Sequence, residues 1–408
     1  MARIAIVTSG HLSTSPRVWR EADALAAAGH AVTATGVWLD ARQAEWDLAL
    51  LAGRGWSWSV AADLRGGTIG SRLARTRARV RSRAGRSRVR LRLGDDPHAL
   101  GYAVDKLERV ARREHADLTI LHLEPALWIG ERLLARGWRI AVDIEDWYSE
   151  NHPELARRDP QVAQLARLES RVFRAARSAT TTSAAMARAL AAAHGMAPPA
   201  VVYNSLREAP LANAAPSDEL RLLWLSQTVG MGRGLEDLVA ALRRLPASWR
   251  LTLVGSAPAA MRAWARAQLG DALFERVRWQ SRVAPQDLDA IVTAHDVGLA
   301  LEVPVCRNKD LTVSNKLLHY LQGGLAALAS DTAGQREVME QVPGAGAVYR
   351  AGNADALAGS LAPWLENPAA VQAGRAARHR AANDALGLHT QVPRLVASVA
   401  RALDGAGA

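Results

Sequence analysis

Two cations stand where helices are expected to begin. Arg233 lies in the glycine-rich run 230–234 ahead of an apolar helical pattern, and Lys316 follows the candidate cap Ser314. A cation at the positive end of a helix dipole is locally unfavourable by up to about 1 kcal/mol. Free helix N–H groups, glycines and basic side chains together are suited to a diphosphate, so an anion beside both cations explains their placement. The alternative is two exposed cations that point into water.

Carboxylates follow two predicted strands in the first half of the chain. Glu124 comes directly after one apolar run, and Glu145 and Asp146 come directly after the next. Acids at the carboxyl ends of parallel strands can orient a hydroxyl group, and their pKa values are open to tuning. We therefore predict that these three acids are catalytic, and helix capping or salt bridging is the alternative. Trp147 and Tyr148 follow at once, and we assign their ring faces to stacking on an acceptor.

Familiar nucleotide and metal motifs are missing. The first loop, SGHLSTSP, has one glycine where a dinucleotide fold has three, and no GxxxxGK[ST] run occurs. Asp287 and Asp289 form an Asp-x-Asp at an expected helix start, so we interpret them as surface residues. We predict no metal site and no cofactor.

Strands alternate with helices twice along the chain. The first series opens with a strand, a helix that begins at Ser15 and Pro16, and a second strand from His30. Residues 205–219 contain prolines with small and polar residues, as a linker does. This order predicts two doubly wound α/β domains with ligands at the carboxyl ends of the strands. A helix ending near residue 403 is expected to return to the first domain.

Charge and composition narrow the class of protein. The chain has 408 residues, 49% of them apolar, and a single cysteine, Cys306, which fits a reducing compartment. The start of the chain is predicted to be a strand and not a signal peptide, and no apolar run is long enough to span a membrane. The net charge of +11 gathers in residues 71–94, which hold ten arginines. A solvated segment, an acidic lipid surface and nucleic acid remain open for that segment.

Six blocks resemble glycosyltransferase family 4, the large group of bacterial GT-B transferases, in order and spacing. They are SPRVWREADALAAAGHAV, LESRVFRAARSATTTSAAMARAL, VVYNSL, GRGLEDLVAAL, LTLVG and SNKLLHYLQGGLAALASDTAGQREVM. The resemblance implies a GT-B fold of two Rossmann-like domains facing across a cleft. Its acceptor-binding domain would be residues 1–205 with about 389–408, and its donor-binding domain residues 206–388. The implied reaction is a retaining, metal-independent transfer from a nucleoside diphosphate sugar.

The resemblance also implies which residues meet the two substrates. Arg233 and Lys316 would hold the donor diphosphate, and the full set assigned to the donor is Gly10, Arg233, Gly234, Glu302, Arg307, Asn308, Asn315, Lys316 and His319. The acceptor set is His11, Trp147 and Tyr148. Many members carry two glutamates eight positions apart, where this chain has Leu311 and His319. Glu302, Arg307 and Asn308 are predicted substitutes.

The departures from the family pattern leave other functions open. A non-catalytic GT-B module that binds a nucleotide or glycan and partners an active transferase is one alternative. A nucleic-acid-binding protein built on residues 71–94 is another, although we expect no nucleic acid partner. The main prediction is a cytoplasmic glycosyltransferase, peripheral at the inner face of the membrane if that segment binds acidic lipid, with a glycan, lipid-linked or small-molecule acceptor.

Overall fold

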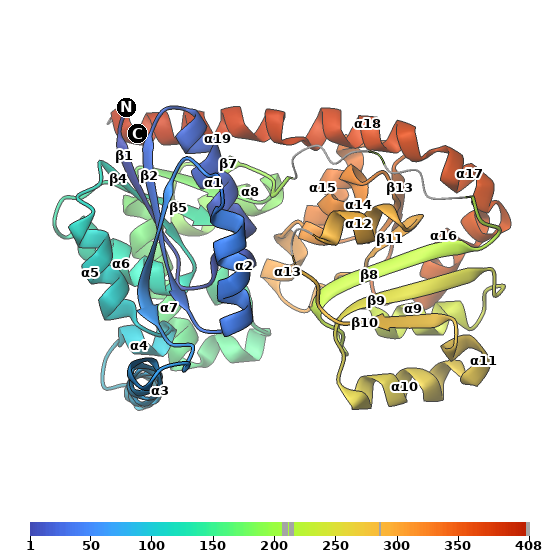
Figure 1. Ribbon diagram of the computed structural model, residues 1–408, viewed down its shortest axis with the longest axis horizontal. Coiled ribbons are helices and arrows are strands. Elements are labelled where there is room, and N and C mark those ends of the chain that lie inside the picture. The colour runs from blue at the N-terminus through green and yellow to red at the C-terminus, as the bar shows by residue number, and fades with distance from the viewer. Residues whose placement is uncertain (206–210, 212–215, 285–286, 405–408) are drawn as a thin grey trace. The chain divides into compact units, whose positions relative to one another are not determined.

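The computed structural model describes residues 1–205, 211, 216–284 and 287–404, and most of the predicted linker lies outside them. Contacts divide the chain into two compact units (Figure 1). The first is Met1–Val202 with the chain from Val392 onward, and the second is Tyr203–Gln391. Each unit is a parallel sheet with helices, so the predicted GT-B fold class is confirmed.

The first unit holds a seven-stranded parallel sheet. In spatial order its strands are β3 (Ser57–Asp63), β2 (Ala31–Trp38), β1 (Arg3–Val7), β4 (Leu118–His122), β5 (Ile140–Ile144), β6 (Ser178–Thr181) and β7 (Ala200–Val201). Its helices are α1 (Pro16–Ala27), α2 (Ala41–Leu51), α3 (Ile69–Arg90), α4 (Pro97–Leu100), α5 (Val104–Arg113), α6 (Glu124–Leu134), α7 (Pro160–Ala175) and α8 (Ala184–His194). Three short 3-10 turns are η1 (Leu12–Thr14), η2 (Tyr148–Glu150) and η3 (Glu154–Arg158).

The second unit holds a six-stranded parallel sheet. In spatial order its strands are β10 (Val277–Gln280), β9 (Trp249–Ser256), β8 (Leu220–Thr228), β11 (Val297–Ala300), β12 (Ala326–Ser330) and β13 (Gly346–Tyr349). Its helices are α9 (Leu235–Leu242), α10 (Ala259–Leu269), α11 (Asp271–Phe274), α12 (Leu288–Thr293), α13 (Arg307–Leu311), α14 (Asn315–Gln322), α15 (Ala333–Gln341), α16 (Ala354–Glu366), α17 (Pro368–Ala373) and α18 (Arg375–Leu386).

The same connection rule orders both sheets. The first strand of each unit lies inside its sheet, and the chain adds strands on one side before it crosses to the other. The crossover lies between β1 and β4 in the first unit and between β8 and β11 in the second. Loops diverge at such a switch point, which is where open α/β sheets bind ligands.

Each unit has its own core. In the second unit Trp224 and Trp249, both within strands, are fully buried. In the first unit the core includes Ile4 and Leu25 together with Leu395 of the last helix, α19 (Leu388–Asp404). The expected C-terminal helix is therefore present, and its second half packs on the first unit.

Candidate donor and acceptor sites

The switch point of the second unit is lined by a glycine-rich loop. The loop follows β8 and ends at Gly234, whose φ of 75° lies in the left-handed region that favours glycine. A Cβ on Gly234 would lie 2.4 Å from the carbonyl oxygen of Leu301. Only glycine lets the loop approach the end of β11 this closely. The start of α9 therefore lies beside the segment that carries Glu302.

Arg233 and Lys316 both reach residues near the carboxyl end of β8. The Nη1 of Arg233 donates to Ser226 Oγ at 2.9 Å, and the Nζ of Lys316 lies 5.5 Å from the centre of the Trp224 ring. Trp224 and Ser226 are two residues apart in β8, which is roughly 6 to 7 Å along a strand. The structure thus brings the two predicted diphosphate ligands to neighbouring places at the carboxyl end of one strand.

Glu302 holds Lys316 at the start of α14. The ammonium of Lys316 contacts the Glu302 carboxylate, which also accepts a hydrogen bond of 3.1 Å from Ser314 Oγ. Burial acts to raise the pKa of Glu302, but the charge and hydrogen bond of Lys316 outweigh it and the net pKa is lowered. Lys316 is therefore a charged, positioned cation.

The remaining donor candidates are spread around α13 and α14. Arg307 and Asn315 are exposed at the first positions of these two helices. Asn308 is fully buried, and its Oδ1 accepts a hydrogen bond of 3.0 Å from Thr312. His319 contacts the Asp289 carboxylate at 2.8 Å. The buried position of Asn308 favours a role in holding α13.

Gly10 and His11 lie in the loop after β1, and both form hydrogen bonds within the first unit. The Gly10 carbonyl accepts a hydrogen bond of 3.2 Å from Val37 N. His11 is 1% exposed, and its Nε2 accepts hydrogen bonds from the backbone of Leu39 and Asp40. Its proton is then on Nδ1, which donates to Asp47 at 2.8 Å. This set of internal bonds explains the burial of His11 without an acceptor.

The three predicted catalytic acids lie together at the end of β4 and β5. Burial raises the pKa of Glu124, and the charge of Asp146 adds to the increase. Burial also raises the pKa of Glu145, with Arg17 opposing the shift and Asp146 supporting it. Carboxyl groups with raised pKa values, here Glu124 and Glu145, retain protons to higher pH, which suits groups that exchange hydrogen bonds with a hydroxyl.

The aromatic pair after these acids is buried. Trp147 is 2% exposed, and its ring lies 5.4 Å from that of His194. Tyr148 is 7% exposed, and burial together with the nearby acids raises its pKa well above the usual value. Because both rings are buried, neither has a face open to solvent on which an acceptor could stack. The structure therefore gives no support to the predicted stacking role.

Glu169 was not predicted from the sequence. It lies fully buried in α7 and accepts a hydrogen bond of 3.0 Å from Ser149 N and another from Ser149 Oγ. Burial raises its pKa to about 7 despite these bonds. Glu169 therefore fixes the turn after β5 that carries the acids. An acid within the apolar stripe of LARLESRVF was the available signal.

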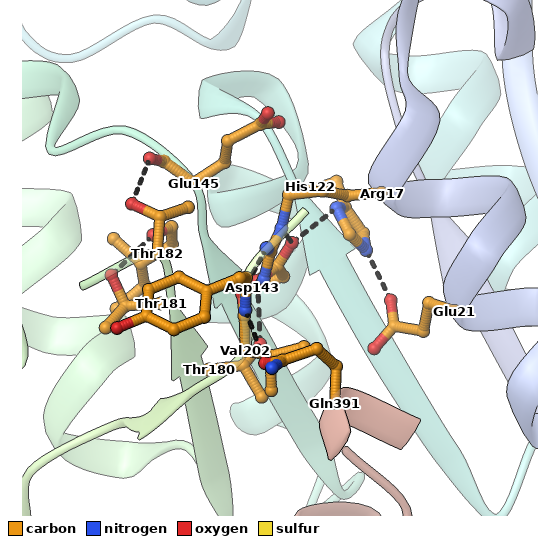
Figure 2. Close-up of polar contacts among 12 residues, drawn as sticks. Arg17, Glu21, His122, Asp143, Glu145, Thr180, Thr181, Thr182, Val202 and Gln391 are labelled. Atoms are coloured by element: carbon orange, nitrogen blue, oxygen red, sulfur yellow. Dashed lines mark hydrogen bonds and ion pairs between the residues drawn. The ribbon is translucent and has the colours of Figure 1, made fainter. Parts of the chain in front are cut away.

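A buried network supports the acidic site from below (Figure 2). Arg17 of α1 donates to both oxygens of Asp143 through Nε and Nη2 at 2.6 and 2.5 Å. His122 contacts Asp143 at 3.2 Å and Glu21 at 2.6 Å. Burial opposes the charge on His122, but the two carboxylates outweigh it and raise its pKa. Arg17 and His122 thus contact two buried acids between the sheet and α1, where an unpaired charge would be costly.

The sequence offered a weak signal for this network. Asp143 and His122 are polar residues at the ends of apolar runs, and Arg17 follows the helix start at Pro16. None was named as a site residue, because polar residues there are equally expected of a solvated strand end. The network leaves Glu145, two residues after Asp143, at the rim of the sheet.

Two general features of the described chain bear on cofactors and membranes. Within residues 1–205, 211, 216–284 and 287–404, no group of three or more histidine, cysteine or acidic residues is arranged to hold a metal. Among the same residues, no helix combines the length and apolar character needed to cross a bilayer.

The sequence of the second unit matches a known family. Residues 219–367 match the family described as glycosyl transferases group 1. This range includes the glycine-rich loop, Glu302 and Lys316. A comparison with curated protein sequences finds no match.

Solved structures with the same fold cover the whole chain. Sucrose-phosphate synthase from Thermosynechococcus elongatus is 17% identical with a TM-score of 0.70, and the match covers 100% of both chains. Anabaena HepE, in complex with UDP-glucose, is 15% identical with a TM-score of 0.70 over 98% of this chain and 100% of that one. A glycosyltransferase from Rickettsia africae is 11% identical with a TM-score of 0.67 over 99% of each. At these identities the likeness shows the fold.

The family match and the fold define the class. Residues 219–367 match the group 1 glycosyltransferase family, and the two units have the GT-B fold. Together they support a sugar transferase, as the resemblance of the six sequence blocks implied.

Proposed function

We propose that the chain transfers a sugar from a nucleoside diphosphate sugar to an acceptor hydroxyl, with retention of configuration and without a metal. The observation that carries the proposal is the pair Arg233 and Lys316 at the carboxyl end of β8, inside the segment that matches group 1 glycosyltransferases. HepE, which shares the fold, was solved with UDP-glucose. We take from it the class of donor.

The donor diphosphate is assigned to the second unit. The N–H groups at the start of α9 and α14 and the two cations supply donors to its oxygens. Lys316 then shares its ammonium between Glu302 and a phosphate oxygen. Stabilising the charge on the departing diphosphate lowers the barrier, and positioning supplies much of the remainder.

The acceptor is assigned to the acidic site of the first unit. Glu124, Glu145 and Asp146 orient its hydroxyl group through hydrogen bonds. In the retaining reaction the bond from the anomeric carbon to the diphosphate breaks, and the bond to the acceptor oxygen forms on the same face. The acceptor proton passes to the leaving phosphate oxygen, so nucleoside diphosphate is released and no protein base is required.

A ligand panel tests the proposal. The full chain is incubated with nucleotides and nucleotide sugars, and both thermal stability and release of nucleoside diphosphate are measured. A ligand at 100 times its dissociation constant stabilises the folded state by about 2.7 kcal/mol. Stabilisation with turnover supports the transferase. Stabilisation without turnover by any sugar favours the non-catalytic binding module, and no stabilisation by any nucleotide contradicts both.

A chelator tests the metal-independent chemistry. Activity should persist in excess EDTA, because two cations of the protein take the place of a metal at the diphosphate. Loss of activity that magnesium or manganese restores would refute this part of the proposal. We place the reaction in the cytoplasm, which fits the single cysteine, Cys306.

A further inference from the structure

The helix α3 and the residues just after it carry five of the seven exposed large apolar side chains described in the first unit. Ile69, Leu73 and Val80 are 78%, 55% and 60% exposed, and Leu91 and Leu93 just after the helix are 68% and 64% exposed. At 3.6 residues per turn, Ile69, Leu73 and Val80 lie within about 40° of one another around the helix. They form one apolar stripe, which we call the outer stripe.

Arginines line both sides of the outer stripe. Arg77 and Arg88 lie about 80–100° from Ile69 on one side, and Arg79, Arg83 and Arg90 lie about 40–80° from it on the other. All five are exposed. From Ile69 to Gly94 the sequence has no acidic residue. The outer face of α3 is therefore apolar along its middle and cationic along both edges.

The opposite face of α3 is anchored, so the outer stripe has a fixed direction. Ser82, Gly85 and Val89 are buried on that face. A Cβ on Gly85 would lie 2.7 Å from the Asp96 carboxylate and 2.9 Å from Ala99 N, so α3 sits directly against α4. Figure 1 shows the two helices side by side at one end of the first unit.

A cationic cavity lies near the end of α3, on the side of the buried Val89 and of α7. It has a volume of about 320 Å³ and includes Val89, Arg92, Arg158 and Arg167 in its lining. Arg167 pairs with Asp95 at 2.5 Å. The cavity has room for a phosphate-bearing group, and its walls carry more positive than negative charge.

We propose that α3 binds the surface of an anionic lipid bilayer. The outer stripe enters the boundary between headgroups and acyl chains, and the flanking arginines contact lipid phosphates, as in helices that lie in the membrane plane. Nucleic acid explains the arginines but not the stripe, because exposed Ile, Leu and Val gain nothing from a phosphate backbone. The inference concerns α3 alone and does not depend on sugar transfer.

Flotation of the full chain with vesicles tests the inference. Binding to phosphatidylglycerol mixed with phosphatidylcholine is expected at low salt, with weak binding to pure phosphatidylcholine. The triple variant Arg77→Gln, Arg83→Gln, Arg88→Gln should bind the anionic vesicles about a hundredfold more weakly. The matched control is Arg243→Gln, Arg380→Gln, Arg394→Gln, which removes the same charge from exposed arginines outside α3 and should bind almost as the parent does.

The apolar part of the inference has its own variant. Leu73→Ser with Val80→Ser keeps every charge and should weaken anionic vesicle binding by about tenfold or more. Equal losses in the two arginine triples would overturn the assignment to α3. So would unchanged binding of the Leu73 and Val80 variant, or preference for duplex DNA over anionic vesicles. Because every readout is binding, failure here is distinct from failure of the transferase proposal.

Discussion

The two switch points have the same topology and opposite chemistry. At β8 and β11 a glycine-rich loop and two cations form a site suited to a diphosphate. At β1 and β4 the corresponding loop carries a histidine committed to internal bonds, and the neighbouring strand ends carry acids with raised pKa values. Strand order therefore determines where in the sheet a site lies, while the residues of the loops and strand ends determine which ligand it can bind.

The largest expected difference between the units lies in their buried ion pairs. Arg17→Met removes both guanidinium hydrogen bonds of the buried Asp143 in the first unit, and among the described residues only His122 and Thr180 still contact it, so the free energy of unfolding should fall by about 3–5 kcal/mol. Arg221→Met in the second unit breaks an Arg–Asp pair of similar geometry, with Asp296. The Arg221 side chain is 24% exposed, so water can donate some of the lost hydrogen bonds to Asp296 and the loss of stability should be smaller. Amide hydrogen exchange measures each unit separately. An equal or larger loss for Arg221→Met would contradict the comparison.

The two loops should differ in their need for glycine. Gly234→Ala combines a positive φ with a collision at the Leu301 carbonyl and should cost about 2–4 kcal/mol. Gly232→Ala has the positive φ without the collision and should cost about 1 kcal/mol. In the first-unit loop, the nearest atom to a Cβ on Gly10 lies at 3.7 Å, so Gly10→Ala should change stability by less than about 0.5 kcal/mol. Chemical denaturation ranks the three variants, and any other order argues against close approach at Gly234.

The cationic and acidic sites should fail in different ways. Lys316→Ala should weaken nucleotide binding more than tenfold, because a charge-assisted hydrogen bond contributes roughly 1.5–3 kcal/mol. Glu145→Gln should lower the transfer rate and leave nucleotide affinity unchanged. Nucleotide titration and initial rates separate the two effects.

Lys309→Ala is the control for the Lys316 variant. Both lysines lower the pKa of Glu302 through their charge, but Lys316 alone of the two contacts it among the described residues. A similar loss of nucleotide affinity in both variants would mean that the lysines act through their overall positive charge, and not that Lys316 binds the diphosphate directly. Circular dichroism of each variant shows whether it keeps its fold.

The two units should also differ in how their stability depends on pH. Glu169 has a folded pKa of about 7, above the ordinary glutamate value of about 4.3. Between these values the folded state holds more protons than the unfolded state, so the stability of the first unit falls as pH rises. Glu169→Gln should flatten that slope by up to about 1.4 kcal/mol per pH unit.

Glu302 provides the opposite case in the second unit. Its folded pKa is lowered, so its contribution is present above the ordinary glutamate pKa and is lost as pH falls. Hydrogen exchange of β4 and β5 amides between pH 5 and 7 measures the first effect, and that of β11 amides below pH 5 measures the second. An unchanged slope in Glu169→Gln would mean that other groups hold the protons.

The sequence predicted the elements that have a regular pattern. Apolar runs such as that of β5 and helix starts such as Ser15 with Pro16 indicated two doubly wound domains, and the structure has them. The strand β3 was not predicted, because it lies at the edge of its sheet and mixes polar with apolar residues. The placement of arginines on α3 also needed the structure, since only a packed face shows which residues remain outside.

The sequence likewise predicted part of each candidate site. Cations at helix starts and acids at strand ends follow from local sequence rules, and the structure places both groups at switch points. The partner of Lys316 is Glu302, fourteen residues earlier, and that of Ser149 is Glu169, twenty residues later. Such pairs, and the burial of Trp147, depend on packing between elements, which a local pattern does not contain.

The last helix sets an order of events during synthesis. Leu395, Val399 and Ala402 of α19 complete the core of the first unit, whose other residues end at Val202. A ribosome adds about 5–20 residues per second, so the first unit waits on the order of 10–40 s for its last core residues. During that interval its core lacks the apolar residues that α19 supplies. Chaperone binding to the nascent first unit is the expected cellular consequence, and release should coincide with the emergence of α19.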